Sequence, residues 1–245
     1  MNAESLTWRT TRPPCALEIE GVWKYYGDFP ALKNIVLQVS AGSTVALLGR
    51  NGAGKTTLLR ILAGLSKPSQ GKVRVQGADA RQESTRRRIG VLGHGISLYD
   101  ELSAIENLMV FGRLYGLPDP VQRADEMLER TGLDRVRDGL VREFSRGMRQ
   151  RLAIARVFLH SPDLLLLDEP FTALDDRAIA VLHSLLAETH QRGGTVVMST
   201  HQLREALELA THVALIQRGQ IAFAGERRQE MLDDTGWLYR TYGEN

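Results

Sequence analysis

The stretch that most constrains this chain runs from residue 49 to residue 57, where a glycine-rich segment separates an apolar run from a helical pattern. Its sequence, Gly-Arg-Asn-Gly-Ala-Gly-Lys-Thr-Thr, fits the pattern G-x-x-x-x-G-K-[ST]. The preceding run, 43–48, has the length of a strand, and leucine and isoleucine recur at helical spacing over 57–65. The sequence therefore predicts a strand, a tight loop and a helix in succession.

Such a loop is typical of a phosphate-binding site. Its backbone N–H groups and the positive end of the helix dipole converge on one point. Glycines let the backbone approach the anion, while Lys55 is expected to contact the β- and γ-phosphates and the Thr56 hydroxyl to hold Mg²⁺. A glycine-rich turn that binds nothing is the alternative, and the flanking strand and helix disfavour it. The expected lining is Gly49, Arg50, Asn51, Gly52, Ala53, Gly54, Lys55, Thr56 and Thr57.

Length and composition indicate an ordinary globular protein. The 245 residues suffice for one α/β domain with a subdomain, and 43% are hydrophobic and 24% charged. A net charge of +2 disfavours a nucleic-acid partner bound through a large basic face. No apolar run reaches the roughly 18 residues that cross a bilayer, so any membrane role is expected to run through a partner. The Thr/Arg/Pro-rich start predicts a flexible leader over 1–15.

Strand patterns flank the loop, and a helical stretch follows them. The β-rich runs 16–22 and 35–39 predict paired strands, and Tyr26 lies between them. An aromatic residue at such a place is more often packing or surface than a nucleotide platform. Helical spacing begins at a capping box, Ser103 with Glu106, which predicts a helical subdomain over about 98–160 on the α/β core.

Two later strand patterns end in side chains that carry chemistry. Four leucines at 164–167 predict a strand buried on both faces of a parallel sheet, and the carboxylates of Asp168 and Glu169 follow directly. Ligands of open α/β sheets gather at the carboxyl ends of strands, where one acid can reach Mg²⁺ and its neighbour can polarise a water. The run 194–200 repeats the pattern and is followed by His201. A lone histidine at a strand end is usually structural, but its place at the edge where the other strands end makes a γ-phosphate contact the alternative.

Taken in order along the chain, these motifs resemble the ATP-binding subunit of an ATP-binding-cassette (ABC) transporter over about residues 17–225. The resemblance implies an α/β P-loop NTPase (ABC ATPase) fold with an antiparallel β subdomain and a helical subdomain. The ABC ATP-binding domain is then expected over 16–228 and a C-terminal tail over 229–245.

The resemblance also implies ATP and Mg²⁺ as cofactors and assigns roles to single residues. Asp168 is expected to hold Mg²⁺ with Thr56, Glu169 to act as general base, and His201 to be the switch histidine; Lys55 is also expected to take part in the chemistry. Further nucleotide contacts are implied for the A-loop aromatic, the D-loop aspartate and the four signature residues, which are Tyr26, Asp175, Ser145, Arg146, Gly147 and Met148.

Two departures from the family pattern narrow the resemblance. His94 stands where the family has its Q-loop glutamine, and we expect it to take over the catalytic duty of that residue. Arg146 replaces the first signature glycine. A Gly-His pair in the Q-loop and a Ser-Arg-Gly-Met signature resemble the haem exporter ATPase of bacterial cytochrome c maturation. Related drug, polysaccharide and lipid exporters share most of these features.

The family resemblance further implies partners and a location. Two copies are expected to clamp two ATP molecules head to tail, and the pair to drive an integral membrane transporter subunit from the cytoplasmic face of the inner membrane. A soluble cassette ATPase acting on ribosomes or DNA is one alternative, but the coiled-coil insertion or basic arms expected of it are not visible. A P-loop kinase or GTPase is another, and it is not expected to show the Ser145 signature or His201.

Overall fold

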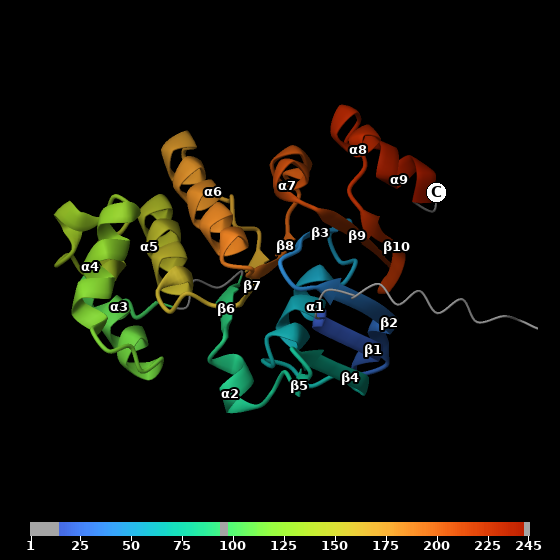
Figure 1. Ribbon diagram of the computed structural model, residues 1–245, viewed down its shortest axis with the longest axis horizontal. Helices are drawn as coiled ribbons and strands as arrows, with labels where there is room; N and C mark the ends of the chain where they lie inside the picture. The colour runs from blue at the N-terminus through green and yellow to red at the C-terminus, as the bar shows by residue number, and fades with distance from the viewer. Residues whose placement is uncertain (1–14, 94–97, 243–245) are drawn as a thin grey trace, which may run out of the picture.

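The structure is a computed structural model that describes residues 15–93 and 98–242 (Figure 1). A six-stranded sheet forms its centre, in the strand order β10-β9-β3-β8-β7-β6. Five strands are parallel, and β10 pairs antiparallel to β9. The strands are β3 (Thr44–Leu48), β6 (Ile89–Leu92), β7 (Leu164–Asp168), β8 (Thr195–Ser199), β9 (His212–Gln217) and β10 (Gln220–Glu226).

The predicted burial of the central strands is confirmed. Every residue of β3, β7 and β8 is buried. Alternate leucines of β7 face the two sides of the sheet, because Leu165 and Leu167 join one hydrophobic cluster and Leu164 and Leu166 join the other. Since β3, β7 and β8 run parallel, the residues at their carboxyl ends meet at one edge.

A second, antiparallel sheet has the order β2-β1-β4-β5. The helix α1 (Lys55–Leu62) lies between the two sheets, and its leucines share one cluster with side chains of both. The predicted strand pair is confirmed, but β1 runs on to Tyr26, so this tyrosine lies in a strand rather than between strands. The strands are β1 (Cys15–Tyr26), β2 (Phe29–Ser40), β4 (Gln70–Val75) and β5 (Ala78–Asp79).

Helices cover the other face of the six-stranded sheet. Figure 1 shows α5 and α6 beside the sheet, with α3 and α4 beyond α5. No helix of the described residues is both long and apolar enough to cross a membrane. The helices are α2 (Glu83–Arg86), which follows β5, then α3 (Ala104–Leu114), α4 (Pro120–Arg130), η1 (Asp134–Val136), η2 (Val141–Glu143), α5 (Arg146–Phe158), α6 (Asp176–Gln191) and α7 (Leu203–Leu209).

The start of α3 is fixed by polar side chains. The Ser103 hydroxyl accepts from the Glu106 N–H at 3.3 Å, and the Glu106 carboxylate accepts from the Ser103 N–H at 2.8 Å, so the predicted capping box is confirmed. The fully buried Asn107 donates to three carbonyls, those of Tyr99, Leu102 and Ser103, and accepts from the Tyr99 N–H. These bonds hold the approach to the helix in one conformation.

Within the described residues, the expected C-terminal tail contains two short helices. They are α8 (Gln229–Asp233) and α9 (Trp237–Tyr242), and they lie beside β9 and β10 in Figure 1. Met231 and Leu238 bury one side of them in the core. The tail is thus packed against the domain.

A half-buried histidine after α5, whose two ring nitrogens are buried, makes the stability of the fold sensitive to acid. The His160 ring stacks on Tyr115 with ring centroids 3.6 Å apart, and burial lowers the pKa of His160 to about 4. In the unfolded chain the histidine pKa returns to about 6.5. The unfolded state therefore binds the proton more tightly, and folding loses stability as the pH falls through this window.

We expect this histidine to cost the folded state about 2 kcal/mol when the pH falls from 7 to 5. His160→Phe keeps a ring on Tyr115 but removes the titration, so its free energy of unfolding should fall less over the same interval. Urea unfolding of both proteins at pH 7 and pH 5 measures the difference. An equal pH dependence of the two proteins would contradict a buried neutral His160.

Candidate functional site

Two glycines of the glycine-rich segment, Gly49 and Gly54, pack so closely on neighbouring strands that a Cβ would clash. Gly49 and Gly54 have φ of 152° and 112°, in the region that favours glycine. A Cβ on Gly49 would lie 2.4 Å from the Ile216 carbonyl oxygen of β9. A Cβ on Gly54 would meet a Leu32 methyl at 2.7 Å. In the sequence analysis, the reason for these glycines is that the backbone must approach an anion. The structure shows a second reason, which is the close packing of Gly49 on β9 and of Gly54 on β2.

Lys55 lies inside the curl of the loop. Its Nζ donates to the Gly49 carbonyl at 2.6 Å and to the Arg50 carbonyl at 3.3 Å, and the side chain is buried. Burial lowers the pKa of Lys55, and the charges of Glu169 and Asp168 oppose that shift. The ammonium is therefore placed among carbonyl oxygens that a phosphate oxygen can replace as its acceptor.

Asp168, the last residue of β7, joins the loop to the sheet. Its carboxylate accepts from the Thr56 hydroxyl at 2.7 Å through one oxygen and from the Ser199 hydroxyl through the other. Ser199 ends β8, and sequence reasoning did not single it out; its place directly before Thr200 and His201 at a strand end is the signal that could have found it.

The Thr56 and Asp168 oxygens fit Mg²⁺, which prefers oxygen ligands and usually keeps waters and substrate phosphates in its shell. Within residues 15–93 and 98–242, no group of three or more His, Cys, Asp and Glu side chains forms a metal cage. A Mg²⁺ site with two protein oxygens, whose remaining ligands are nucleotide and water oxygens, agrees with the Thr56–Asp168 pair and with the lack of such a cage.

Glu169 and His201 are in direct contact. The Glu169 carboxylate lies 2.8 Å from the His201 Nδ1 and accepts from the His201 backbone N–H at 3.3 Å. Glu169 has φ of 54°, a left-handed conformation that a residue with a Cβ rarely adopts. Its side chain is 13% exposed, against 68% for His201, so the carboxylate lies beneath a solvent-facing imidazole.

A cavity of about 320 Å³ connects the loop with the carboxylates and with one edge of the antiparallel sheet. Tyr26 and Phe29, paired across the β1–β2 turn, supply two rings with 52% and 66% of their surface exposed. Phe29 was missed by sequence reasoning, because only strand pairing brings it opposite Tyr26. The lining comprises Tyr26, Phe29, Ala31, Asn51, Gly52, Gly54, Lys55, Thr56, Thr57, Asp168 and Glu169.

The four signature residues do not line this cavity. Ser145 caps α5 by accepting from the Met148 N–H at 3.2 Å, and both Ser145 and Arg146 are exposed. A Cβ on Gly147 would lie 3.2 Å from the Ala173 carbonyl, so the start of α5 packs closely on the segment after β7. The buried side chains of α5 and of α1 belong to different clusters, on opposite faces of the sheet.

Asp175 stands apart from this cavity as well. Asp175 caps α6, where its carboxylate accepts from the Ala178 N–H at 2.8 Å. His94 lies outside the described residues, and its role stays a prediction.

Comparison with known proteins decides the family. The model of the family described as "ABC transporter" matches residues 32–172, which is more than half of the chain. The chain belongs to the ABC transporter family. As a member, it is an ATP-binding cassette that hydrolyses ATP in a reaction coupled to transport, and the expected P-loop fold is confirmed.

Curated relatives include the Nod factor export ATP-binding protein I of Cupriavidus metallidurans, 38% identical over 233 residues, covering 93% of this chain and 77% of that one. The daunorubicin resistance ATP-binding protein DrrA3 of Streptomyces coeruleorubidus is 39% identical over 225 residues, with coverages of 90% and 71%.

Solved structures agree with the fold. An ATP-binding subunit of an ABC transporter superposes with a TM-score of 0.82 at 29% identity, over 94% of this chain and 95% of that one. A dimeric post-hydrolysis ATP-binding cassette bound to ADP and Pi superposes with a TM-score of 0.77 at 27% identity, over 86% of this chain and 99% of that one.

The packing of this ABC cassette predicts different costs for two glycine substitutions. Gly52→Ala meets nothing within 4 Å and adds only left-handed strain, about 1–2 kcal/mol. Gly49→Ala also drives a methyl into the Ile216 carbonyl, which adds about 1–3 kcal/mol of overpacking. We expect Gly49→Ala to lose clearly more stability and ATP affinity than Gly52→Ala, measured by thermal unfolding and nucleotide titration. Equal losses would contradict the observed packing of the loop on β9.

Proposed function

We propose that this chain is the ATPase subunit of an exporter and that it drives a membrane-embedded partner as a pair of copies. The observation that carries the proposal is a divided site. One copy gathers Lys55, Asp168 and Glu169 around a cavity, while Ser145 stands on the opposite face of the sheet with no place in that cavity. In the proposed pair, Ser145 of a second copy completes the site around each cavity.

In each site the chain's own residues hold the nucleotide and move the proton. Lys55 and the loop N–H groups bind the phosphates, and Tyr26 stacks on the adenine. Thr56 and Asp168 would hold Mg²⁺, which would supply positive charge to offset the negative charge of the phosphates. Glu169 accepts the proton of the attacking water, and the 2.8 Å contact to His201 orients that carboxylate.

The partner copy supplies the rest. Ser145 and the N–H groups at the start of α5 meet the terminal phosphate, with Arg146, Gly147 and Met148 around it, and Asp175 lies at the same interface. The similarity to a solved dimeric cassette with ADP and Pi supports this arrangement. Loss of the bridging phosphate after hydrolysis opens the pair, and the opening moves the membrane partner from its cytoplasmic face.

For the kind of cargo, the relatives support the proposal better than the haem resemblance does. Nod factor export and daunorubicin resistance are the named roles of two relatives that cover at least 90% of this chain. They favour the exporter class of drugs, polysaccharides and lipids over haem export in cytochrome c maturation, whose support is limited to the signature and to His94. A cassette acting on ribosomes or DNA is disfavoured by the net charge of +2.

Export can be tested by producing the chain with its membrane partner in inverted vesicles and following ATP-dependent uptake of daunorubicin and of haem in parallel. Drug uptake that requires ATP supports the proposal, whereas uptake of haem alone supports the cytochrome c reading. ATP hydrolysis that responds to ribosomes or DNA, and not to the membrane partner, would overturn both.

Lys55→Ala is the matching test of the site. The substitution removes charge-assisted hydrogen bonds to phosphate, each worth about 1.5–3 kcal/mol, so we expect ATP to bind about 10- to 100-fold more weakly. Lys72→Ala removes an exposed charge on β4, outside the cavity lining, and serves as the control. Calorimetric titration with ATP measures both variants. An unchanged ATP affinity in Lys55→Ala would contradict the assignment.

A further inference from the structure

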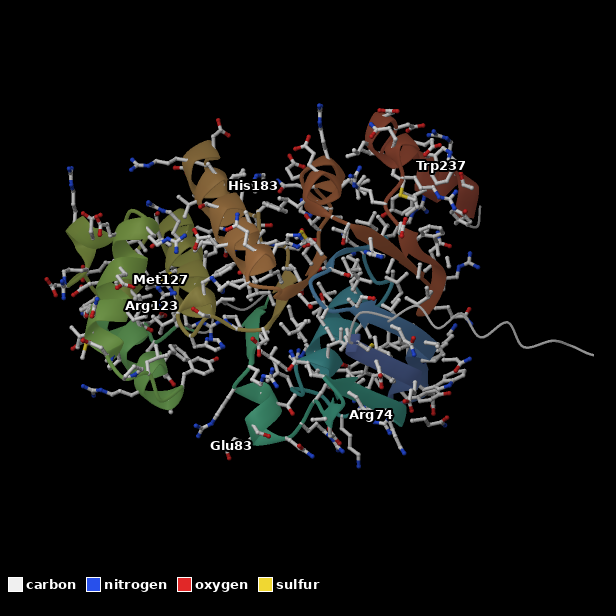
Figure 2. The ribbon with its side chains drawn as sticks, in the orientation of Figure 1. Arg74, Glu83, Arg123, Met127, His183 and Trp237 are labelled. Atoms are coloured by element: carbon white, nitrogen blue, oxygen red, sulfur yellow. The ribbon has the colours of Figure 1, made fainter. Side chains whose placement is uncertain are left out.

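One stretch of the chain collects basic side chains that the nucleotide site does not use. Residues 67–88 hold seven of the chain's 31 Lys and Arg residues and two of its 29 Asp and Glu residues, so the remaining residues carry 24 basic and 27 acidic side chains. The stretch forms β4, β5 and α2, which lie along one side of the molecule in Figure 1, opposite α8 and α9. Figure 2 places Arg74 and Glu83 on that same side. The protein is thus close to neutral as a whole but basic over residues 67–88, which we call the basic side.

A cavity of about 210 Å³ lies within the basic side, between the end of α1 and the antiparallel sheet. It exists because β5 pairs only with Arg74 and Val75, so residues 70–72 of β4 have no strand partner on that side within the described residues. One water takes about 30 Å³, so the cavity has room for a phosphate group and several waters. Four cationic side chains line it, against one carboxylate, that of Asp79; the cations are Lys67, Lys72, Arg74 and Arg81.

The two lysines of the cavity supply charge that no acid offsets directly. Lys67 and Lys72 are both exposed, and neither forms an ion pair within residues 15–93 and 98–242. Lys72 lies opposite Glu20 of β1 in the strand register, but the Glu20 carboxylate accepts a hydrogen bond from Arg74 instead. The Lys24 ammonium donates to the Lys67 carbonyl at 2.9 Å and adds a further positive charge at the rim.

The two arginines of the cavity are paired with acids but keep donors for another anion. Arg74 Nη1 lies 3.7 Å from Glu18 and 3.1 Å from Glu20, and Arg81 holds Asp79 at 2.8 Å. These pairs are exposed to solvent and therefore contribute little. A guanidinium carries five N–H donors, so each arginine can also donate to a phosphate oxygen. With Lys24 included, five cations face three carboxylates, which leaves an excess of positive charge at the cavity.

The basic side continues over α2. Arg87 pairs with Glu83 at 2.8 Å and Arg88 with Asp163 at 2.6 Å, whereas the exposed Arg86 forms no ion pair in the described part of the chain. The cations are therefore spread over a surface rather than gathered at one point. Clusters of four to eight Lys and Arg side chains are typical of proteins that contact anionic membranes, because the negative surface potential acts on all of them together.

We propose that the cavity binds the phosphate group of an anionic phospholipid and that the basic side lies against the headgroups of the membrane. The inference rests on the proposed function beside a membrane-embedded partner, and it adds a contact between this chain and the lipid itself. Lys67 and Lys72 bind the phosphate, Arg74 and Arg81 donate further hydrogen bonds to it, and Arg86 lies against neighbouring headgroups. The contact orients the cassette with α8 and α9 away from the membrane.

The double substitution Lys67→Ala and Lys72→Ala tests the site, and it should leave the fold intact because both side chains are exposed. Co-sedimentation of the full chain with vesicles of equimolar phosphatidylglycerol and phosphatidylcholine measures binding. We expect the double variant to bind about 10- to 30-fold more weakly than the unaltered chain. The unaltered chain should not bind vesicles of phosphatidylcholine alone, and about 1 M salt should release it from the anionic vesicles.

The matched control is Arg204→Ala combined with Arg228→Ala. It removes the same charge from α7 and from the start of α8, and vesicle binding should not change. Equal weakening in both double variants would show an effect of net charge alone and overturn the inference, and so would a failure of the unaltered chain to bind anionic vesicles.

Titration with inorganic phosphate separates a lipid headgroup from a soluble anion. Phosphate binding that depends on Lys67 and Lys72, without binding to anionic vesicles, would show a site for a soluble phosphate and overturn the membrane assignment. Because the vesicles contain no transporter subunit, either failure leaves the proposed export function standing, and ATP-dependent uptake tests that function separately.

Discussion

The hydrogen bond of 2.7 Å between the Thr56 hydroxyl and the Asp168 carboxylate is the link on which the site depends. It joins the first turn of α1 to the end of β7, two segments that lie more than a hundred positions apart in the chain. The bond forms because parallel strands bring their carboxyl ends to one edge of the sheet, where Ser199 of β8 binds the other carboxylate oxygen. The sheet thus sets the distance between the phosphate loop and the acids.

The same sheet also separates the helix that follows the phosphate loop from the helix that Ser145 caps. Residues of β7 alternate between two clusters, so α1 packs on one face and α5 on the other. The phosphate loop precedes the helix on the first face and Ser145 caps the helix on the second, and Ser145 does not line the cavity at the loop. In the proposed function, this separation is the reason why a second copy is needed to surround the nucleotide, and why nucleotide turnover can act on the distance between copies.

The sequence was sufficient to predict those parts of the fold and site that are formed by residues close together in the chain. The strand, loop and helix around Lys55, the buried leucines before Asp168 and the capping box at Ser103 follow from periodicity and turn chemistry. Phe29 and Ser199 were missed because pairing with β1 and the order of strands in the sheet place them at the site. The haem assignment did not gain support, because the curated relatives are named for Nod factor export and daunorubicin resistance.

The most direct test of this account is the mass of the Glu169→Gln chain in solution with and without ATP and Mg²⁺. This change keeps the side chain's shape but removes the base, so bound ATP persists. Sedimentation velocity should show a monomer without nucleotide and a species of twice that mass with ATP, and a Ser145→Arg substitution should abolish the larger species. A Glu169→Gln chain that binds ATP yet remains monomeric at every concentration would contradict the shared site.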